Sequence, residues 1–532
     1  SAGSTIADDD NNTALGYNAL KNATAGAGNT ALGSHAMGLG AADGSNNTVV
    51  GFTAGYDLAA GGDSNVMVGT YAGANATSAK QNVIIGLDAC GLGVLANASS
   101  TEGMYNVVVG PQAGYDLTSG QSNILLGKDA GANFTDNYQN IAIGTYAMDA
   151  AAAGEHDNVA IGYGALSAEN SNANHCVAVG HGALALQNAN VKNTAIGGLA
   201  GDAITDGDGN TFVGYLAGSD LTGGDYNTGI GDRAFENGTG SSNTCIGYQA
   251  GGGATLSGAD NVIVGKGAGA LLTDGPGNVL IGKSAGTSMT TGDYNIAIGF
   301  EAADGLVGAA DDNVAIGKGA LGASTNATKK NIAIGSNALS ANVAAASINV
   351  AIGYEAGDAI TSGTHNTLVG HQAGSTIATN GSMTAIGHTA LQLATGSNNT
   401  AVGVSSGKEI AAGAGNTSIG ANAMYNADGD EDDNTAIGSA ALYELDNDAS
   451  DGNVAVGQAA GRYYDDGGGN TALAQAANCV LVGKLARVSR DDAENQIVIG
   501  YNALGIGNNS VALGNTSIAS IKGQVDFAAY SD

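Results

Sequence analysis

Tryptophan is absent from this chain of 532 residues, phenylalanine occurs only 6 times, and proline occurs only twice, as Pro111 and Pro276. Large aromatic side chains anchor most globular cores, so the core here must consist of small aliphatic residues packed in layers. Glycine is abundant, with 89 residues, but collagen and proline-rich linkers need far more proline than this chain has. The composition therefore argues against an ordinary globular domain and against a collagen-like fibre.

Basic side chains are scarce: 16 Lys and Arg stand against 48 Asp and Glu, which gives a formal net charge of −32. A nucleic-acid-binding protein needs a basic surface that displaces counterions, so nucleic acid is not an expected partner. The acidic residues gather between repeats, as in residues 428–433 and 446–451. Such runs are typical of solvated loops and leave open weak divalent-cation binding, while no other cofactor is expected.

Cysteine and histidine are also few. Cys90, Cys176, Cys245 and Cys479 share no short spacing and each fill a slot of a repeat, so disulfides are not expected. Candidate metal ligands occur as His175, Cys176 and His181 in one repeat and as His365 and His371 in another. His371 and His388 hold equivalent slots, which also accept Tyr, Ser, Lys and Phe. Exposed, tolerant positions are therefore the favoured interpretation; no metal site, catalytic residue or enzymatic activity is expected. No run of 18 apolar residues occurs, so membrane insertion is not expected either.

What the chain does contain is a repeat. Asn-Thr-Ala-Ile-Gly or a close variant recurs about every 17 or 18 residues, for example at residues 12–16, 193–197 and 434–438. Roughly thirty copies at one short period predict an all-β parallel solenoid, with one repeat per coil. The repeat decays late in the chain, where Ala474 replaces the closing glycine. We therefore expect a lead-in segment at 1–11, a solenoid shaft at 12–478 and an irregular cap at 479–532.

We number each repeat from its Asn as position 0. Positions 1 to 3 are β-branched or aliphatic and predict a short strand, which the Gly at position 4 ends; position 7 is usually Ala, which predicts a narrow interior. Stacked Asn side chains are expected to hydrogen-bond along a column.

Positions 1 and 3 are expected to face the interior and position 2 the outside. Position 2 is uncharged in every repeat, which would make the outward face apolar. An apolar outer face predicts self-association as a homotrimer, unless the small side chains at position 2 merely tolerate exposure to solvent. The expected interface residues are Ala14, Val49, Ile84, Leu125, Phe212, Leu280 and Leu368.

Two sets of proteins carry similar repeats. Asn12 to Leu20 reads Asn-Thr-Ala-Leu-Gly-Tyr-Asn-Ala-Leu, which resembles units in the shafts of bacteriophage tail fibres. Residues 509–514, Asn-Ser-Val-Ala-Leu-Gly, resemble the heads of trimeric autotransporter adhesins, which form a left-handed parallel β-roll in a trimer. The final Tyr530-Ser531-Asp532 is similar to the start of a self-cleaving chaperone in phage fibres. The resemblance implies an extracellular protein on a virion tail or a cell surface.

Two functions follow as alternatives. The first is an attachment fibre that recognises a host cell surface, through a glycan or a protein. The second is a self-assembling extracellular filament, or a bacterial surface adhesin head, with no specific small ligand. The uniform repeat surface cannot encode a specific site, so contacts are expected from irregular loops at 91–105, 428–433, 443–451 and 462–466. The candidate contact residues are Tyr105, Tyr443, Asp446, Arg462, Tyr463, Tyr464 and Asp465.

Overall fold

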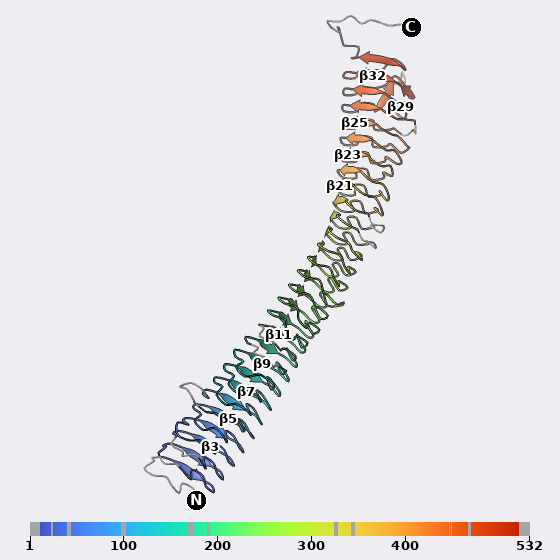
Figure 1. Ribbon diagram of the computed structural model, residues 1–532. Coiled ribbons are helices and arrows are strands. Elements are labelled where there is room, and N and C mark those ends of the chain that lie inside the picture. The colour runs from blue at the N-terminus through green and yellow to red at the C-terminus, as the bar shows by residue number, and fades with distance from the viewer. Residues whose placement is uncertain are drawn as a thin grey trace. The chain divides into compact units, whose positions relative to one another are not determined.

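The computed structural model describes residues 11–22, 25–39, 44–96, 103–168, 174–188, 192–323, 328–341, 346–445, 447, 449–465 and 470–520. It is a parallel β-solenoid of about 27 turns, so the predicted fold class is confirmed with slightly fewer coils than expected. The chain divides into two compact units, Ser1–Gly277 and Asn278–Asp532, which are described separately (Figure 1). No helix that could cross a membrane occurs in these ranges.

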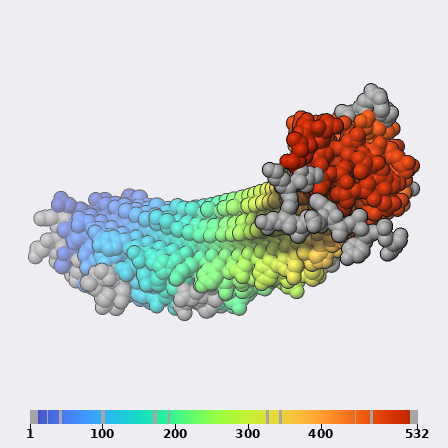
Figure 2. All heavy atoms as spheres, turned by 90° about the horizontal axis from the view of Figure 1, so that it is seen from above, coloured from blue at the N-terminus to red at the C-terminus, as the bar shows by residue number. Residues whose placement is uncertain are grey.

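Each coil of unit 1 contributes one short strand. The strands are β1 Thr13–Leu15, β2 Thr30–Leu32, β3 Thr48–Val50, β4 Val66–Val68, β5 Val83–Ile85, β6 Val107–Val109, β7 Ile124–Leu126, β8 Ile141–Ile143, β9 Val159–Ile161, β10 Val177–Val179, β11 Thr194–Ile196, β12 Thr211–Val213, β13 Thr228–Ile230, β14 Thr244–Ile246 and β15 Val262–Val264. Successive strands pair in parallel without offset, as Ala14 opposite Ala31 illustrates. Figure 2 shows the atoms of successive coils aligned in continuous rows.

Unit 2 continues the pattern and then adds irregular strands. Its strands are β16 Val279–Ile281, β17 Ile296–Ile298, β18 Val314–Ile316, β19 Ile332–Ile334, β20 Val350–Ile352, β21 Thr367–Val369, β22 Thr384–Ile386, β23 Thr400–Val402, β24 Thr417–Ile419, β25 Thr435–Ile437, β26 Val454–Val456, β27 Tyr463–Asp465, β28 Asn470–Ala472, β29 Ala476–Ala477, β30 Val480–Val482, β31 Ala493–Glu494, β32 Gln496–Ile499 and β33 Ser510–Leu513. The main sheet runs from β26 through β30 and β32 to β33. β27 and β28 form an antiparallel pair, and β29 and β31 a parallel pair, beside it. The expected boundary at 478/479 stays a prediction.

The strands face the opposite way to the prediction. The middle residue, at position 2, points into its own coil, and the residues at positions 1 and 3 point outward. Val49, Ile84, Leu125, Phe212, Leu280 and Leu368 are all completely buried within the single chain, and Ala14 in the first described coil is half-buried. The six buried residues are therefore core residues and offer no outer surface to a partner.

The reason for the inverted facing lies in the asparagine. Side chains two residues apart along a strand point to the same side, so positions 0 and 2 share a face. The asparagines at position 0 are almost all buried, as Asn47, Asn65 and Asn106 show. Their amides hydrogen-bond inside the coil, so the polar residue sets the inward side of the strand. Hydrophobicity alone favours the β-branched residues as the inward ones, whereas this parity with the buried asparagine places position 2 there.

The asparagines form the expected column. Asn65 donates from Nδ2 to Oδ1 of Asn47 at 3.0 Å and to the carbonyl oxygen of Ala79 at 2.7 Å. Its own Oδ1 accepts the backbone N–H of Asn82 at 3.0 Å. Each amide thus joins its own coil to the coils before and after it, which explains the recurrence of Asn at this position.

The glycine at position 4 is required by both conformation and space. Gly51 has φ +142°, in a region that side chains rarely adopt, and a Cβ there would lie 2.2 Å from the carbonyl oxygen of Gly69. Both constraints explain why glycine recurs at this position. Adjacent coils can approach closely here only because neither carries a side chain.

The interior is filled by three kinds of residue. They are the residue at position 2, the small residue at position 7, and one larger residue at either position 8 or position 11. Leu166 and Leu184 hold position 8 in their coils, whereas Leu117 and Ile360 hold position 11 where position 8 is Gly. All of these side chains are buried, and the predicted narrow interior is confirmed by Ala at position 7.

Candidate binding surfaces

The outward face of the sheet is uncharged, with an aliphatic residue at position 3 of every strand from β1 to β26 and with Val or Ile at position 1 of 14 of these strands and Thr at position 1 of the other 12. At position 3, Ile196, Ile230 and Ile386 are about two-fifths exposed, at 41%, 39% and 40%. Positions 1 to 3 of β1 to β26 contain no Asp, Glu, Lys or Arg. Rows of aliphatic side chains with exposure of this size form a continuous strip along each unit. Such strips on soluble proteins mark association surfaces.

The acidic residues lie away from this strip and bind backbone. Oδ1 of Asp63 accepts the backbone N–H of Ser45 at 2.9 Å, and Oδ1 of Asp225 accepts that of Asp208 at 2.8 Å. Oδ1 of Asp432 does the same for Ala414 at 2.7 Å. These carboxylates hold turns of adjacent coils together, which is a structural role for part of the acidic charge.

A ladder of cations and aromatic rings follows position 9 through four successive coils of unit 2. Nζ of Lys408 lies 3.1 Å from the Tyr425 hydroxyl and 5.0 Å from its ring centroid. The Tyr425 and Tyr443 rings stack at 5.3 Å with only 5° between their planes. The Arg462 guanidinium lies 4.5 Å from the Tyr443 ring centroid and 5.0 Å from that of Tyr463. All five side chains are half-buried, so part of the ladder remains open to solvent.

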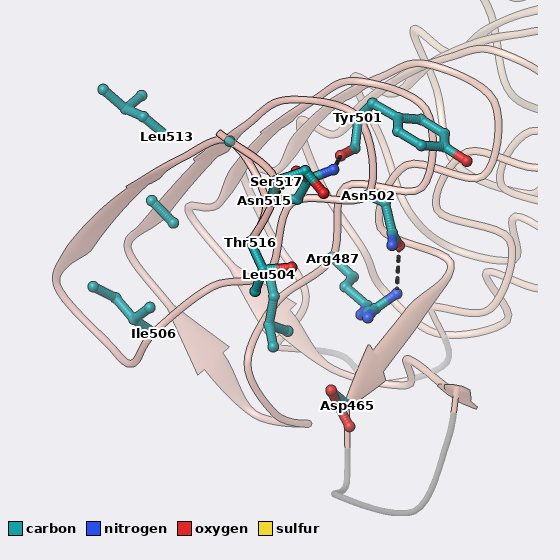
Figure 3. A pocket seen from close by; sticks show the side chains of 12 residues that line it. Asp465, Arg487, Tyr501, Asn502, Leu504, Ile506, Leu513, Asn515, Thr516 and Ser517 are labelled. Carbon is teal, nitrogen blue, oxygen red and sulfur yellow. Dashed lines mark hydrogen bonds between the residues drawn. The ribbon is translucent and has the colours of Figure 1, made fainter. Parts of the chain in front are cut away.

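An open hollow of about 770 Å³ lies beside the last described strands of unit 2 (Figure 3). Nη1 of Arg487 donates to Oδ1 of Asn502 at 2.8 Å, and Nδ2 of Asn515 donates to the carbonyl oxygen of Tyr501 at 2.8 Å. Nε of Arg487 is buried and has no hydrogen-bond partner within the described ranges. The hollow is lined by Asp465, Arg487, Tyr501, Asn502, Leu504, Ile506, Ala512, Leu513, Gly514, Asn515, Thr516 and Ser517. This set combines a cation, a carboxylate, amides and hydroxyls with aliphatic walls, which suits a hydroxyl-bearing polar ligand.

The predicted contact residues fall into three groups. Tyr443, Arg462 and Tyr463 meet in the ladder, and Asp465 lines the hollow. Tyr464 pairs with Thr471 in the antiparallel pair of β27 and β28. Tyr105 is exposed in unit 1, and Asp446 lies outside the described residues. Lys408, Tyr425 and Arg487 are not among the predicted contact residues, although the shared position 9 could have identified the first two.

The candidate metal ligands separate in the structure. Cys176 is buried inside its coil, where Nε2 of Gln187 donates to its Sγ at 2.9 Å. His181 stacks on Tyr163 at 5.3 Å. His175 instead lies beside two residues of the preceding coil, His156 and Asp157. The predicted set of His175, Cys176 and His181 therefore does not form one site.

The remaining cysteines and histidines are also placed by the coils. The four cysteines are buried thiols, and burial raises the pKa of the Cys90 thiol to about 12. His371 stacks on Tyr354 at 5.1 Å and on His388 at 5.0 Å, as equivalent slots in adjacent coils would. Because the rings stack on each other, their edges rather than their faces point outward.

Comparison with known proteins adds no relative: neither a model of a protein family nor a curated protein sequence matches this chain.

Proposed function

We propose that the protein is an extracellular attachment fibre subunit that assembles as a homotrimer and recognises a cell surface through irregular coils of unit 2. The observation that carries this proposal is the uncharged strip formed by the aliphatic residues at position 3 and the Val, Ile or Thr residues at position 1 of successive strands. Association was expected through position 2, but position 2 points into the coil, so the association surface is assigned to this strip instead. The resemblance to phage tail fibre shafts and autotransporter heads supports the trimer and the extracellular location.

The strip suits association between copies of the same chain. Copies packed in parallel would bring identical coils to the same height, so aliphatic residues would meet aliphatic residues at every level. The net charge of −32 opposes association in general, yet the charged residues lie in turns and not on the strip. Burial of each aliphatic side chain would contribute roughly 25 cal/mol per Å² of apolar surface removed from water.

Association is tested by a charge placed on the strip. Ile386→Asp puts a carboxylate at position 3 of β22, where it would be desolvated in the assembly. Light scattering should give three times the chain mass for the natural protein and a smaller mass for Ile386→Asp. The matched control is Leu393→Asp in the same coil, because Leu393 is 44% exposed but lies beyond the strand. A monomeric natural protein, or equal dissociation by both variants, would overturn the proposal.

Recognition is assigned to the hollow around Arg487 and to the neighbouring ladder. The Arg487 guanidinium lines the hollow and can donate to a hydroxyl or carboxylate oxygen, and both groups occur on cell-surface glycans. We expect the natural protein to bind such glycans on a panel and Arg487→Gln to lose that binding. Arg490→Gln is the control, because Arg490 is exposed, pairs with Asp492 at 2.9 Å and does not line the hollow.

The alternative is a filament subunit without a specific ligand. The repeated strip favours it as much as it favours the fibre, since both need self-association. If the natural protein forms continuous filaments and neither it nor any variant binds a glycan or a cell, the structural role replaces attachment.

A further inference from the structure

Two histidines and an aspartate from adjacent coils of unit 1 come together outside the strip. In sequence they are far from the ladder and the hollow of unit 2. Nδ1 of His156 lies 2.9 Å from Oδ2 of Asp157, and Nε2 of His175 lies 3.6 Å from the same oxygen. All three ligand atoms lie within 4.8 Å of one another. The side chains are 24%, 41% and 56% exposed, so an ion can reach them from solvent.

The coil architecture holds the three side chains in place. The His156 ring stacks on Tyr138 of the preceding coil, with centroids 4.7 Å apart and planes at 16°. The backbone N–H of His156 donates to Oδ1 of Asn174 at 2.8 Å. Asp157 and His175 both hold position −1, the residue before position 0, with φ of 60° and 63°. Backbone and ring contacts thus fix the directions of the ligands before any ion binds.

We propose that His156, Asp157 and His175 bind a divalent transition-metal ion, with zinc as the reference ion. Tetrahedral zinc with bonds of about 2.0–2.1 Å places its ligand atoms about 3.3 Å apart. The separations of 2.9 and 3.6 Å lie on either side of that value, so small side-chain rotations suffice. Two imidazoles and one carboxylate favour zinc, copper or nickel over calcium and magnesium, which prefer oxygen ligands.

Three protein ligands leave one coordination position open to water or an external donor. The bound ion would join two adjacent coils, because His156 and Asp157 precede β9 and His175 precedes β10. The thiol of Cys176 is excluded from this site, since it lies buried in the coil interior while His175 is exposed. The site is therefore a nitrogen and oxygen site without sulfur.

The test is titration of the tag-free full chain with Zn²⁺ by calorimetry, and with Co²⁺ by absorption spectroscopy. We expect one strong equivalent per chain and a cobalt spectrum without thiolate charge-transfer bands. His175→Gln should weaken zinc binding at least about tenfold, because even partners outside the coordination shell change affinity by about 10–100-fold. Gln139 holds the same position in an earlier coil with φ of 59°, so this substitution fits the fold.

The matched control is His181→Gln, which removes a histidine that stacks on Tyr163, away from the cluster. It should bind zinc as the natural chain does, and Asp157→Asn should weaken binding as His175→Gln does. The proposal is overturned if His175→Gln binds zinc unchanged, if His181→Gln loses as much affinity, or if cobalt binds through thiolate. Weak binding of many equivalents, insensitive to all three substitutions, would show acidic-surface binding only and would also overturn it.

Discussion

Each buried asparagine satisfies polar groups in more than one coil. For Asn65 these are Oδ1 of Asn47, the carbonyl oxygen of Ala79 and the backbone N–H of Asn82. Removing the amide leaves the last two groups buried without partners. An unsatisfied buried polar group costs about 1–3 kcal/mol, so a single asparagine is worth several ordinary contacts.

Asn65→Ala is therefore expected to lower the free energy of unfolding by about 2–6 kcal/mol, as the sum of two such penalties. Urea unfolding followed by circular dichroism measures the change. Asn75→Ala is the control, because Asn75 is only half-buried and donates to two carbonyl oxygens near the surface. Equal losses from the two substitutions would contradict the role assigned to the column.

The exceptions to the asparagine column show what a repeat pattern cannot predict. Where Cys176 replaces the asparagine, Gln187 enters the interior, donates to the Cys176 sulfur and accepts from Nδ2 of Asn193 at 3.2 Å. The side-chain oxygen of Gln187 thus accepts the hydrogen bond from Asn193 that an asparagine in place of Cys176 would accept. The sequence shows both residues, but only the packed coil shows that they compensate for each other.

Aspartate at position 9 makes stability depend on pH. Burial raises the pKa of the Asp202 carboxyl, and the same cause acts on Asp149, Asp304 and Asp358. The folded chain therefore keeps these protons at pH values where the unfolded chain has lost them, so folding is favoured as pH falls through the raised pKa.

Asp202→Asn should raise the melting temperature at pH 7, and the gain should vanish below the unfolded pKa of about 3.9. Exposed Asp274→Asn should leave it nearly unchanged at both pH values; a gain for Asp202→Asn that persists in acid would refute this explanation.

At the scale of the coil, positions 8 and 11 share one volume. Gly357 at position 8 accompanies Ile360 at position 11, and a Cβ on Gly357 would lie 3.0 Å from Cδ1 of Ile360 and 2.7 Å from Cδ1 of Leu368. Leu339, one coil earlier, holds position 8 with φ of 51°, so leucine tolerates the backbone there. The coil accepts one large side chain at this place, at either position.

Gly357→Leu alone should overpack the coil and lower stability by about 1–3 kcal/mol. Ile360→Ala alone should leave a cavity and cost about 2–5 kcal/mol. The double variant should be less destabilised than the sum, with a coupling of about 0.5–3 kcal/mol in a double-mutant cycle from urea unfolding. Strict additivity would show that the two positions do not share space.

The strand elements could be predicted from sequence, but their facing could not. The Asn and Gly at each end bound the strand residues 1 to 3, and the structure confirms strands such as β11 and β21 there. Which side of the strand faces the interior depends on whether positions 0 and 2 or positions 1 and 3 are buried. An uncharged strand is compatible with either arrangement. The shared position 9 of Lys408, Tyr425, Tyr443 and Arg462 can be read from the sequence, but the contacts between these side chains depend on how the coils stack.

At the scale of the whole molecule, coils are interchangeable units. Asn366 donates its backbone N–H to Oδ1 of Asn349, 17 residues earlier, and the same bond recurs from Asn349 to Asn331 in the preceding coil. Deleting residues 350–366 removes one complete coil and lets β19 pair with β21 in register. The shortened chain should keep its circular dichroism spectrum and its association state.

The control for that deletion is removal of residues 350–357 only. This partial deletion shifts Asn366 out of the column and inverts or misplaces the strand that follows. It should lower the melting temperature sharply, whereas the complete-coil deletion changes it little. If both deletions behave alike, the coils are not the cooperative units that their hydrogen bonds suggest.

The short reach of the coil-to-coil hydrogen bonds also governs the kinetics of folding. Partners such as Asn47 and Asn65 are 18 residues apart, and a wider gap such as the 24 residues between Asn82 and Asn106 is bridged where a coil is enlarged. All-β proteins usually fold slowly because their strands pair across long stretches of chain. Here each new coil needs only the one before it, so folding can start at any coil and spread stepwise along the chain. A chain that emerges gradually from a ribosome or a pore could therefore fold as it appears, without waiting for its far end.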